Sequence, residues 1–369
     1  MSILIKNCRI IANGKTYAKN ILVRNGKIAK ITNNELKADK IIDAKNNFVM
    51  QGLIDCHVHF REPGLTHKED FLTGSMAAVK GGVTTFFDMP NTIPPTTTVE
   101  LLEEKRRLAA KSVANYGLIF GAAMDNIGEI ARAKNIAAVK LYMDHTTGNL
   151  KIDDQEAITE IFKTSKTSII HAEADNVKNA IDIFIKNKIK NRLHVAHVSS
   201  EKELKYAKQN KIKNQVTVEV APHHLFMNEN DVQRLGAFAE MKPRLKTEAD
   251  QKALWFGIKN NMVDIIATDH APHLKEEKEK AEYPFGVPGV ETMLPLLLDA
   301  FNSKKIDLQT IIRLCCENPA KIFKIKNKGF LKEGYDADLT IVDLDKRQAV
   351  RNEDLLTKCK WSPYEGKIL

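Results

Sequence analysis

The chain has 369 residues, 43% of them hydrophobic, which predicts one large domain or two domains around a buried core. No apolar run is long enough to span a bilayer, no signal peptide is recognisable, and five cysteines without a CxxC pair favour a reduced, cytoplasmic setting with no membrane partner. The formal charge of +9 comes largely from lysines scattered along predicted helices, which is typical of a solvated surface and argues against a nucleic-acid partner.

Short alternating strands with turn residues between them are expected at the start of the chain, at 4–11, 19–24, 27–32 and 40–43. Asn13-Gly14 and Asn25-Gly26 are hairpin turn signals. A last β segment at 334–343 is expected to return and pair with these strands. The sequence therefore predicts a small β domain built from residues 1–46 and 328–369.

The pattern changes at residue 47, from which apolar strands alternate with amphipathic helices. Strands are expected at 48–57, 83–89, 116–123, 137–142, 168–172, 193–198, 215–220 and 264–268. Helices are expected at 99–111, 153–165, 176–186, 200–209 and 307–322. Eight apolar strands with intervening helices predict an α/β fold, a (β/α)8 barrel of the TIM type, over residues 47–327.

The motif His57-Val-His59 ends the first of these strands. Residues i and i+2 of a strand point to the same face, so both imidazoles aim at one point, as two ligands of a divalent metal would. Arg61 follows two residues later, where its guanidinium can bind an acidic group, and Glu62-Pro63-Gly64 ends the strand with a turn. Alone, a His-x-His pair is a weak signal of a metal site.

Other polar residues also lie at the carboxyl ends of predicted strands, where barrel enzymes place their chemistry. They are Asp88 and Asn91 after the second strand, Lys140 on the fourth, His171 and His197 at the fifth and sixth, His223 and His224 after the seventh, and Asp269 and His273 after the eighth. Each of them, taken alone, is compatible with the role of an ordinary hydrogen-bonded polar residue in the core. Their gathering at the same end of successive strands predicts a metal-dependent hydrolase site.

Longer segments carry a resemblance to a known family. They read Asp-Cys-His-Val-His-Phe-Arg-Glu-Pro-Gly, Asp-Met-Pro-Asn-Thr, Val-Lys-Leu-Tyr-Met, Val-Ala-Pro-His-His-Leu, Ala-Thr-Asp-His-Ala-Pro-His and Pro-Gly-Val-Glu-Thr-Met-Leu-Pro. On these motifs, which together with the flanking β segments extend over nearly the whole chain, the sequence resembles the dihydroorotases of the amidohydrolase superfamily. The resemblance implies reversible closure of N-carbamoyl-L-aspartate to (S)-dihydroorotate and water in pyrimidine (UMP) biosynthesis.

The resemblance also implies two Zn²⁺ ions per chain, bridged by a carbamylated Lys140. The implied ligands are, for the first ion, His57, His59 and Asp269, and for the second, His171 and His197. Imidazole and carboxylate ligands suit zinc, and carbamylation by CO2 turns a cationic lysine into a carboxylate that reaches two ions. Metals about 3.5–4 Å apart activate water and polarise a carbonyl, and Asp269 is implied to move the proton.

The substrate of such an enzyme carries a carboxylate off its ring, and Arg61 offers a bidentate fork for it. By resemblance the substrate is also held by Asn91, His273 and Lys242. The segment 144–150 has the small and hydroxyl residues of a mobile lid, in which Thr146 is implied to close over the substrate.

The chain departs from the family pattern at three places. Position 196 is Ala, where some relatives have a Cys associated with an additional metal, so only two metals are expected. Lys242 stands where the family often has Asn or Arg, which leaves the details of substrate binding open. Relatives continue beyond a segment like 361–366 with further strands, so the final β unit is expected to be incomplete. A site role for His223 and His224 is also left open.

Two alternative functions are compatible with parts of the pattern. An allantoinase or hydantoinase would share the metal site, so the discriminating feature is Arg61 with Asn91 and His273, which a carboxylated ring requires. A non-catalytic homologue that scaffolds aspartate transcarbamoylase would lose metal ligands, and this chain has every expected type. The oligomeric state stays open between a monomer, a homodimer and a complex with aspartate transcarbamoylase.

Overall fold

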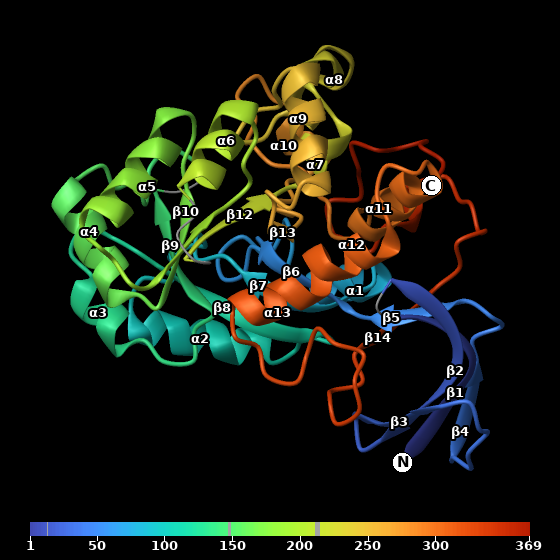
Figure 1. Ribbon diagram of the computed structural model, residues 1–369. Coiled ribbons are helices and arrows are strands. Elements are labelled where there is room, and N and C mark those ends of the chain that lie inside the picture. The colour runs from blue at the N-terminus through green and yellow to red at the C-terminus, as the bar shows by residue number, and fades with distance from the viewer. Residues whose placement is uncertain (13, 147–148, 211–214) are drawn as a thin grey trace.

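The structure, a computed structural model, describes residues 1–369 apart from 13, 147–148 and 211–214. Its largest unit, within the described residues, is a sheet of eight parallel strands, each beside the next one in the chain (Figure 1). They are β6 (Leu53–Val58), β7 (Val83–Asp88), β8 (Asn115–Gly121), β9 (Ala138–Tyr142), β10 (Thr167–His171), β11 (Arg192–Val195), β12 (Val216–Val220) and β13 (Ile265–Ile266). A bridge between Val58 and His270 brings the last strand back to the first, so the sheet is a nearly closed barrel, as predicted.

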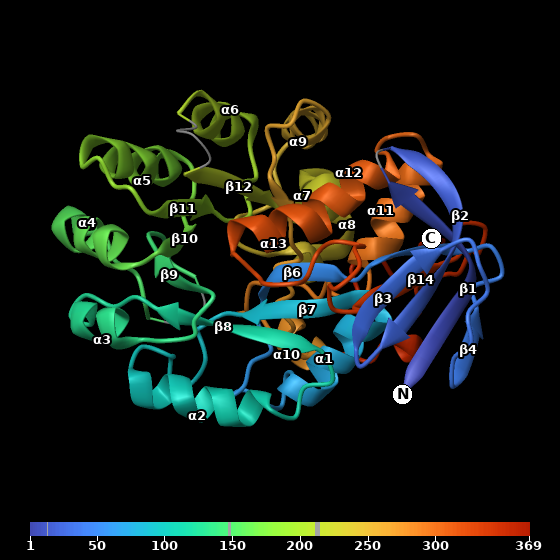
Figure 2. The ribbon, with the colours of Figure 1, turned by 60° about the horizontal axis from the view of Figure 1, so that its bottom comes forward.

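Helices cover the outside of the barrel (Figure 2). The longer ones are α1 (Phe71–Lys80), α2 (Val99–Ala109), α4 (Gln155–Thr164), α5 (Asp175–Lys186), α6 (Glu201–Gln209), α9 (Glu248–Lys259) and α11 (Met293–Asn302). The shorter ones are α3 (Ile127–Arg132), α7 (Pro222–Phe226), α8 (Glu229–Leu235), η1 (Gly236–Ala239), α10 (Lys275–Lys278), α12 (Leu308–Ile312), η2 (Arg313–Glu317), α13 (Asn318–Ile322) and η3 (Asn352–Asp354). Among the described helices, none is long and apolar enough to cross a membrane.

The helix α5 shows why these segments pack against the strands. Four of its five buried residues recur at the three- and four-residue spacing of one helix face: Val177, Ala180, Ile181 and Phe184. The predicted helices at 99–111, 153–165, 176–186 and 200–209 correspond to α2, α4, α5 and α6.

A second sheet lies beside the barrel (Figure 2) and contains strands from both ends of the chain. It consists of β1 (Ser2–Ala12), β2 (Lys15–Arg24), β3 (Lys27–Thr32), β4 (Lys40–Asp43), β5 (Phe48–Gln51) and β14 (Leu339–Val342). The pairing of β14 with β5 confirms that the C-terminal strand returns to the N-terminal ones. The turn signal at Asn13 lies outside the described residues, and the division into a β domain (1–46 and 328–369) and a barrel (47–327) stays a proposal.

The strand predicted at 48–57 was wrong as a single element, because it is two strands. β5 joins the small sheet, β6 begins the barrel, and Gly52 lies between them. A Cβ atom at Gly52 would lie 2.2 Å from the side chain of Thr84, so only glycine fits where the chain passes from one sheet to the other. The helix predicted at 307–322 is also interrupted, by the π turn η2 between α12 and α13.

Candidate metal centre and active site

The carboxyl ends of the barrel strands surround one cavity. Ten residues predicted for the site line it: His57, His59, Arg61, Asn91, Lys140, Thr146, His171, His197, Lys242 and Asp269. The same wall includes Tyr142 and Phe285, which the sequence analysis did not select. Residues far apart in the chain meet here because parallel barrel strands end on one side.

His57, His59 and Asp269 form a first group of ligand atoms. The Oδ1 atom of Asp269 lies 3.2 Å from Nε2 of His57 and 3.1 Å from Nε2 of His59. Asp269 has a φ of 47°, in the left-handed region that non-glycine residues rarely adopt, in the turn that follows β13. One ligand atom from each residue lies within 4.8 Å of the others, a spacing at which the three can hold one ion.

The remaining ring nitrogens of the two histidines have acceptors nearby. Nδ1 of His57 lies 2.8 Å from Oε1 of Glu219, and Nδ1 of His59 lies 2.6 Å from Oδ1 of Asn91. These oxygens favour the ring proton on Nδ1, which leaves Nε2 as an electron-pair donor toward Asp269 and the cavity. Metal-ligating histidines are usually oriented in this way by a hydrogen bond to the second nitrogen.

His171, His197 and Lys140 form a second group. Nδ1 of His171 and Nε2 of His197 face each other at 3.0 Å. The Lys140 amine lies 3.5 Å from Nε2 of His57. Burial is the main cause that lowers the pKa of His171 and of His197, and the charge of Lys140 also lowers both. The Lys140 amine therefore interacts electrostatically with both histidines of the second group.

Lys140 is fully buried on β9, and burial lowers its pKa to about 8, although Glu219 and Asp269 oppose the change. Only the neutral form of an amine reacts with CO2. A pKa near 8 makes that form accessible close to neutral pH, which suits a lysine that is to be carbamylated.

Two residues of the first group, His59 and Asp269, have the protonation states that a metal ion requires. Burial lowers the pKa of His59 to about 3, so its ring is neutral. Burial alone would raise the pKa of Asp269, but the charge of His57 and the hydrogen bond with His59 lower it below its usual value. Neutral imidazoles and an ionised carboxylate are the ligand forms that bind a metal.

Arg61 lines the cavity, and His273 lies behind it. Arg61 has a φ of 64°; its Nε donates to the Pro272 carbonyl oxygen at 3.1 Å, and its terminal nitrogen lies 3.0 Å from Nε2 of His273. Burial lowers the pKa of Arg61 to about 10, so the guanidinium stays charged at neutral pH. His273 is fully buried and also contacts the Lys68 amine, at 3.1 Å. His273 thus contacts Arg61, and the substrate contact expected for His273 from the sequence stays a prediction.

Lys242 lies on the cavity wall, as does Thr146 of the segment 144–150. Residues 147–148 of that segment lie outside the described part of the chain. The Lys242 amine donates to the His145 carbonyl oxygen at 3.1 Å and lies 4.9 Å from the centre of the Phe285 ring. These contacts join the segment expected to act as a lid to the opposite wall of the cavity.

His223 and His224 are a buried pair at the start of α7, with ring centres 4.4 Å apart. Nε2 of His224 donates to the Pro243 carbonyl oxygen at 3.0 Å. This bond accounts for one nitrogen of His224 structurally and leaves the question of a site role open.

Glu219 on β12 is a residue that the sequence analysis missed. It is fully buried and contacts His57, His194 and Cys56. Burial would raise the pKa of Glu219, but His57 and His194 lower it well below its usual value. The available signal was a single acid inside the apolar run Val216-Thr-Val-Glu-Val220, because a buried carboxylate requires partners.

The donor set fits two metal ions of the zinc type. The first group offers two imidazole nitrogens and a carboxylate oxygen around one point, and the second offers two facing imidazole nitrogens. Both ligand types suit zinc, and a carbamate on Lys140 would add carboxylate oxygens to the set.

The Amidohydrolase family matches residues 48–362, which is most of the chain. The chain therefore belongs to the amidohydrolase family. Among its relatives, a dihydroorotase from Methanosarcina acetivorans is 37% identical over 409 residues, covering 98% of this chain and 88% of that protein. The multifunctional protein CAD of Squalus acanthias is 38% identical over 325 residues, covering 86% of this chain and 14% of that protein.

A solved structure, L-hydantoinase (dihydropyrimidinase) from Arthrobacter aurescens, is similar with a TM-score of 0.94 at 27% identity, covering 100% of this chain and 92% of that one. This similarity extends over the barrel and the small sheet together. It agrees with the barrel architecture that the sequence predicted.

Proposed function

We propose that the chain is a dihydroorotase, which closes N-carbamoyl-L-aspartate to (S)-dihydroorotate and water in pyrimidine biosynthesis and catalyses the reverse hydrolysis. Relatives of that name, 37% and 38% identical over nearly the whole chain, support this function. The structural observation that carries the proposal is the guanidinium of Arg61 on the wall that also holds His57 and Asp269. A ring with a cleavable amide and a carboxylate requires both a hydrolytic centre and a cationic group.

Asp269 is the group that moves the proton in this proposal. In hydrolysis, water adds to the ring carbonyl carbon and the C–N bond breaks, while Asp269 accepts a proton from the water and delivers it to the leaving nitrogen. In synthesis, Asp269 takes a proton from the carbamoyl nitrogen as it bonds to the side-chain carboxyl carbon, and returns it to the departing hydroxyl. Metal ions, when bound, polarise the carbonyl and activate water.

Arg61 binds the ring carboxylate in this proposal, and Pro272 and His273 hold its side chain in place. Asn91, Thr146 and Lys242 line the same cavity and hold the rest of the substrate. Because a neutral cyclic amide offers no partner for the Arg61 charge, this contact selects a carboxylated ring.

The alternatives within the family are an allantoinase or a hydantoinase, and the structural similarity to L-hydantoinase is weakly consistent with the latter. The test is turnover by the purified protein of dihydroorotate, hydantoin and allantoin under the same conditions. We expect dihydroorotate to have the highest kcat/KM. A higher kcat/KM for hydantoin or allantoin would replace the proposed function, and no turnover of any of them would favour a non-catalytic homologue.

We further propose that the cavity holds two Zn²⁺ ions, bridged by a carbamylated Lys140. Removal of metal with a chelator is expected to abolish activity, because the metals supply several kcal/mol of transition-state stabilisation. Zn²⁺ is then returned in steps. Activity is expected to be fully restored once two ions per chain are bound in the cavity. Full activity of metal-free protein would contradict the proposal.

The carboxylate contact gives a prediction for specificity. Arg61→Met is expected to lower kcat/KM for dihydroorotate at least roughly tenfold, because a charge-assisted hydrogen bond contributes about 1.5–3 kcal/mol and each 1.36 kcal/mol is a factor of about ten. Hydrolysis of uncharged dihydrouracil is expected to change little. The measurement is the ratio of kcat/KM for the two substrates in wild type and variant.

Arg244→Met is the matched control for this ratio. Arg244 is also an arginine and lies near the Phe285 ring of the cavity wall, but the Arg244 side chain is 62% exposed. The control is expected to leave the ratio unchanged. An equal loss on both substrates in Arg61→Met would mean that Arg61 supports the metal centre or the fold and does not bind the carboxylate.

Association with aspartate transcarbamoylase and formation of a homodimer are both retained as proposals. The similarity to part of a multifunctional protein supports the idea that this unit works beside other catalytic domains. Activity of the isolated chain in the turnover assay would establish that no partner is required.

A further inference from the structure

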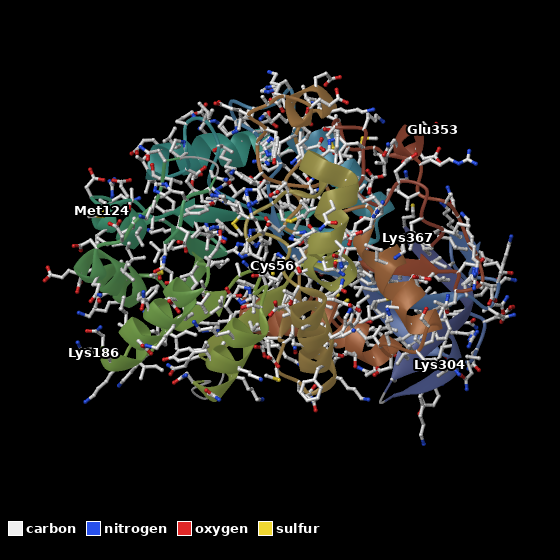
Figure 3. All side chains as sticks on the ribbon, turned by 90° about the horizontal axis from the view of Figure 1, so that it is seen from above. Cys56, Met124, Lys186, Lys304, Glu353 and Lys367 are labelled. Atoms are coloured by element: carbon white, nitrogen blue, oxygen red, sulfur yellow. The ribbon has the colours of Figure 1, made fainter. Side chains whose placement is uncertain are left out.

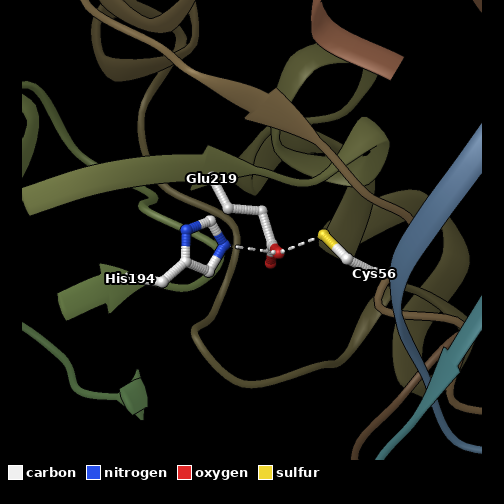
Figure 4. Close-up of side chains that lie close together, drawn as sticks. All are labelled: Cys56, His194 and Glu219. Carbon is white, nitrogen blue, oxygen red and sulfur yellow. Dashed lines mark hydrogen bonds and ion pairs between the residues drawn. The ribbon is translucent and has the colours of Figure 1, made fainter. Parts of the chain in front are cut away.

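We infer that Cys56, His194 and Glu219 form another metal site, which binds zinc behind His57 (Figure 4). The inference does not depend on the proposed activity. The three residues lie on β6, β11 and β12, and each is fully buried. Cys56 lies near the middle of the molecule in the view of Figure 3.

An irregularity in β6 brings the cysteine into this position. The pairing of β6 with β7 shifts register between Asp55 and Val58. Consecutive residues of a regular strand point to opposite faces, but here Cys56 and its neighbour His57 both contact Glu219.

The three ligand atoms lie within 4.8 Å of one another, and two of their separations are close to those around a zinc ion. Oε2 of Glu219 lies 3.1 Å from Nε2 of His194 and 3.6 Å from Sγ of Cys56. Zinc bonds of about 2.0–2.2 Å to nitrogen or oxygen and about 2.3 Å to sulfur, at tetrahedral angles, separate nitrogen from oxygen by about 3.4 Å and sulfur from oxygen by about 3.6 Å. The two separations from Glu219 therefore accommodate the ion with a shift of a few tenths of an ångström.

His194 also has the partner that a ligating histidine needs. Its Nδ1 lies 2.9 Å from the Thr217 hydroxyl, which in turn donates to the Leu193 carbonyl oxygen at 3.4 Å. The hydroxyl oxygen can accept the proton of Nδ1, which leaves Nε2 to the metal.

Charge favours an ion at this site. When zinc binds, the Cys56 thiol releases its proton to solvent, and the resulting thiolate and the Glu219 carboxylate together neutralise the 2+ charge. Without an ion, Glu219 Oε2 has a contact with Nε2 of His194 at 3.1 Å and a weak hydrogen bond from the neutral Cys56 thiol at 3.6 Å.

Glu219 connects this site to the catalytic cavity. Its Oε2 faces Cys56 and His194, whereas its Oε1 accepts from the backbone N–H of His197 at 3.1 Å and lies beside Nδ1 of His57. An ion on Oε2 would fix the carboxylate that orients His57. Such an ion would be additional to the two expected in the cavity.

The first test replaces the metal of the purified protein with Co²⁺ and records the near-ultraviolet spectrum, in which a Co²⁺–thiolate bond gives a charge-transfer band. We expect the band in the wild type and in Cys315→Ala, and no band in Cys56→Ala. Cys315 is the matched control because it is equally buried. Metal analysis is expected to find one ion fewer per chain in Cys56→Ala than in Cys315→Ala.

The second test separates this site from the cavity. Lys140→Ala is expected to lose the cavity ions and keep the thiolate band. A band that disappears in Lys140→Ala would mean that the thiolate binds an ion of the cavity, and would overturn the inference. Absence of the band in the wild type would also overturn the inference. Cys56, His194 and Glu219 would then be a hydrogen-bonded cluster without a metal ion. If Cys56→Ala does not fold, X-ray absorption of the wild-type zinc decides, because a sulfur neighbour at about 2.3 Å is expected.

Discussion

Replacing Lys140 by alanine is expected to lower kcat at least about 1,000-fold, because the metal ions supply several kcal/mol of transition-state stabilisation and about 4 kcal/mol corresponds to that factor. Lys140 is buried between the two groups of ligands, 3.5 Å from Nε2 of His57, and its pKa is lowered to about 8. The variant removes the only stem that can carry a bridging carboxylate in this proposal. Metal analysis is therefore expected to show loss of the cavity ions together with the activity.

Chemical rescue tests whether the lysine acts as a carbamate. A small carboxylic acid added to Lys140→Ala is expected to restore part of both the activity and the bound metal, since its carboxylate replaces that of the carbamate. Lys163→Ala, at an exposed lysine on α4, is the control and is expected to keep wild-type activity with no response to the acid. Full activity of Lys140→Ala without added acid would rule out the bridging role.

Replacing Asp269 by asparagine is expected to lower kcat by roughly 10²–10⁴-fold, the usual contribution of a positioned acid–base group. Asparagine keeps the size of the side chain but removes the basic oxygen that lies within 3.2 Å of both His57 and His59. The pKa of Asp269 is lowered, so the carboxylate is ionised at neutral pH. The measurement is kcat, with the metal content determined on the same sample.

Metal content is essential for this variant because Asp269 is also an expected ligand. Asp153→Asn, at a side chain that is 79% exposed, provides the matched control and is expected to leave kcat unchanged. An unchanged kcat in Asp269→Asn with both cavity ions bound would refute the proton-transfer role. A loss of kcat that added Zn²⁺ fully restores would assign Asp269 to metal binding alone.

Most of the cavity wall was predictable because it depends on local rules. Alternation of apolar residues marks strands, and barrel strands end on one side, so polar residues at those ends, such as Lys140, His171 and Asp269, were expected to meet. The spacing of His57 and His59 predicted that both rings point one way, and both lie beside the same oxygen of Asp269.

Three features were decided only by the tertiary structure, because each depends on contacts between distant segments. One predicted strand divides between two sheets at Gly52, where Thr84 of the neighbouring strand leaves no room for a side chain. His273 lies behind Arg61 because the loop after β13 folds back over it. Glu219 contacts Cys56 of β6 and His194 of β11, and the contact with Cys56 depends on a register shift in β6.

The sequence by itself determined which types of polar side chain line the cavity, the strands that carry them and the end of the barrel where they gather, since these follow from composition and short-range periodicity. The tertiary structure decided the pairings between these side chains, including which carboxylate orients which imidazole. These pairings depend on the register and closure of the barrel, because a shift of one residue in a strand turns every side chain to the opposite face.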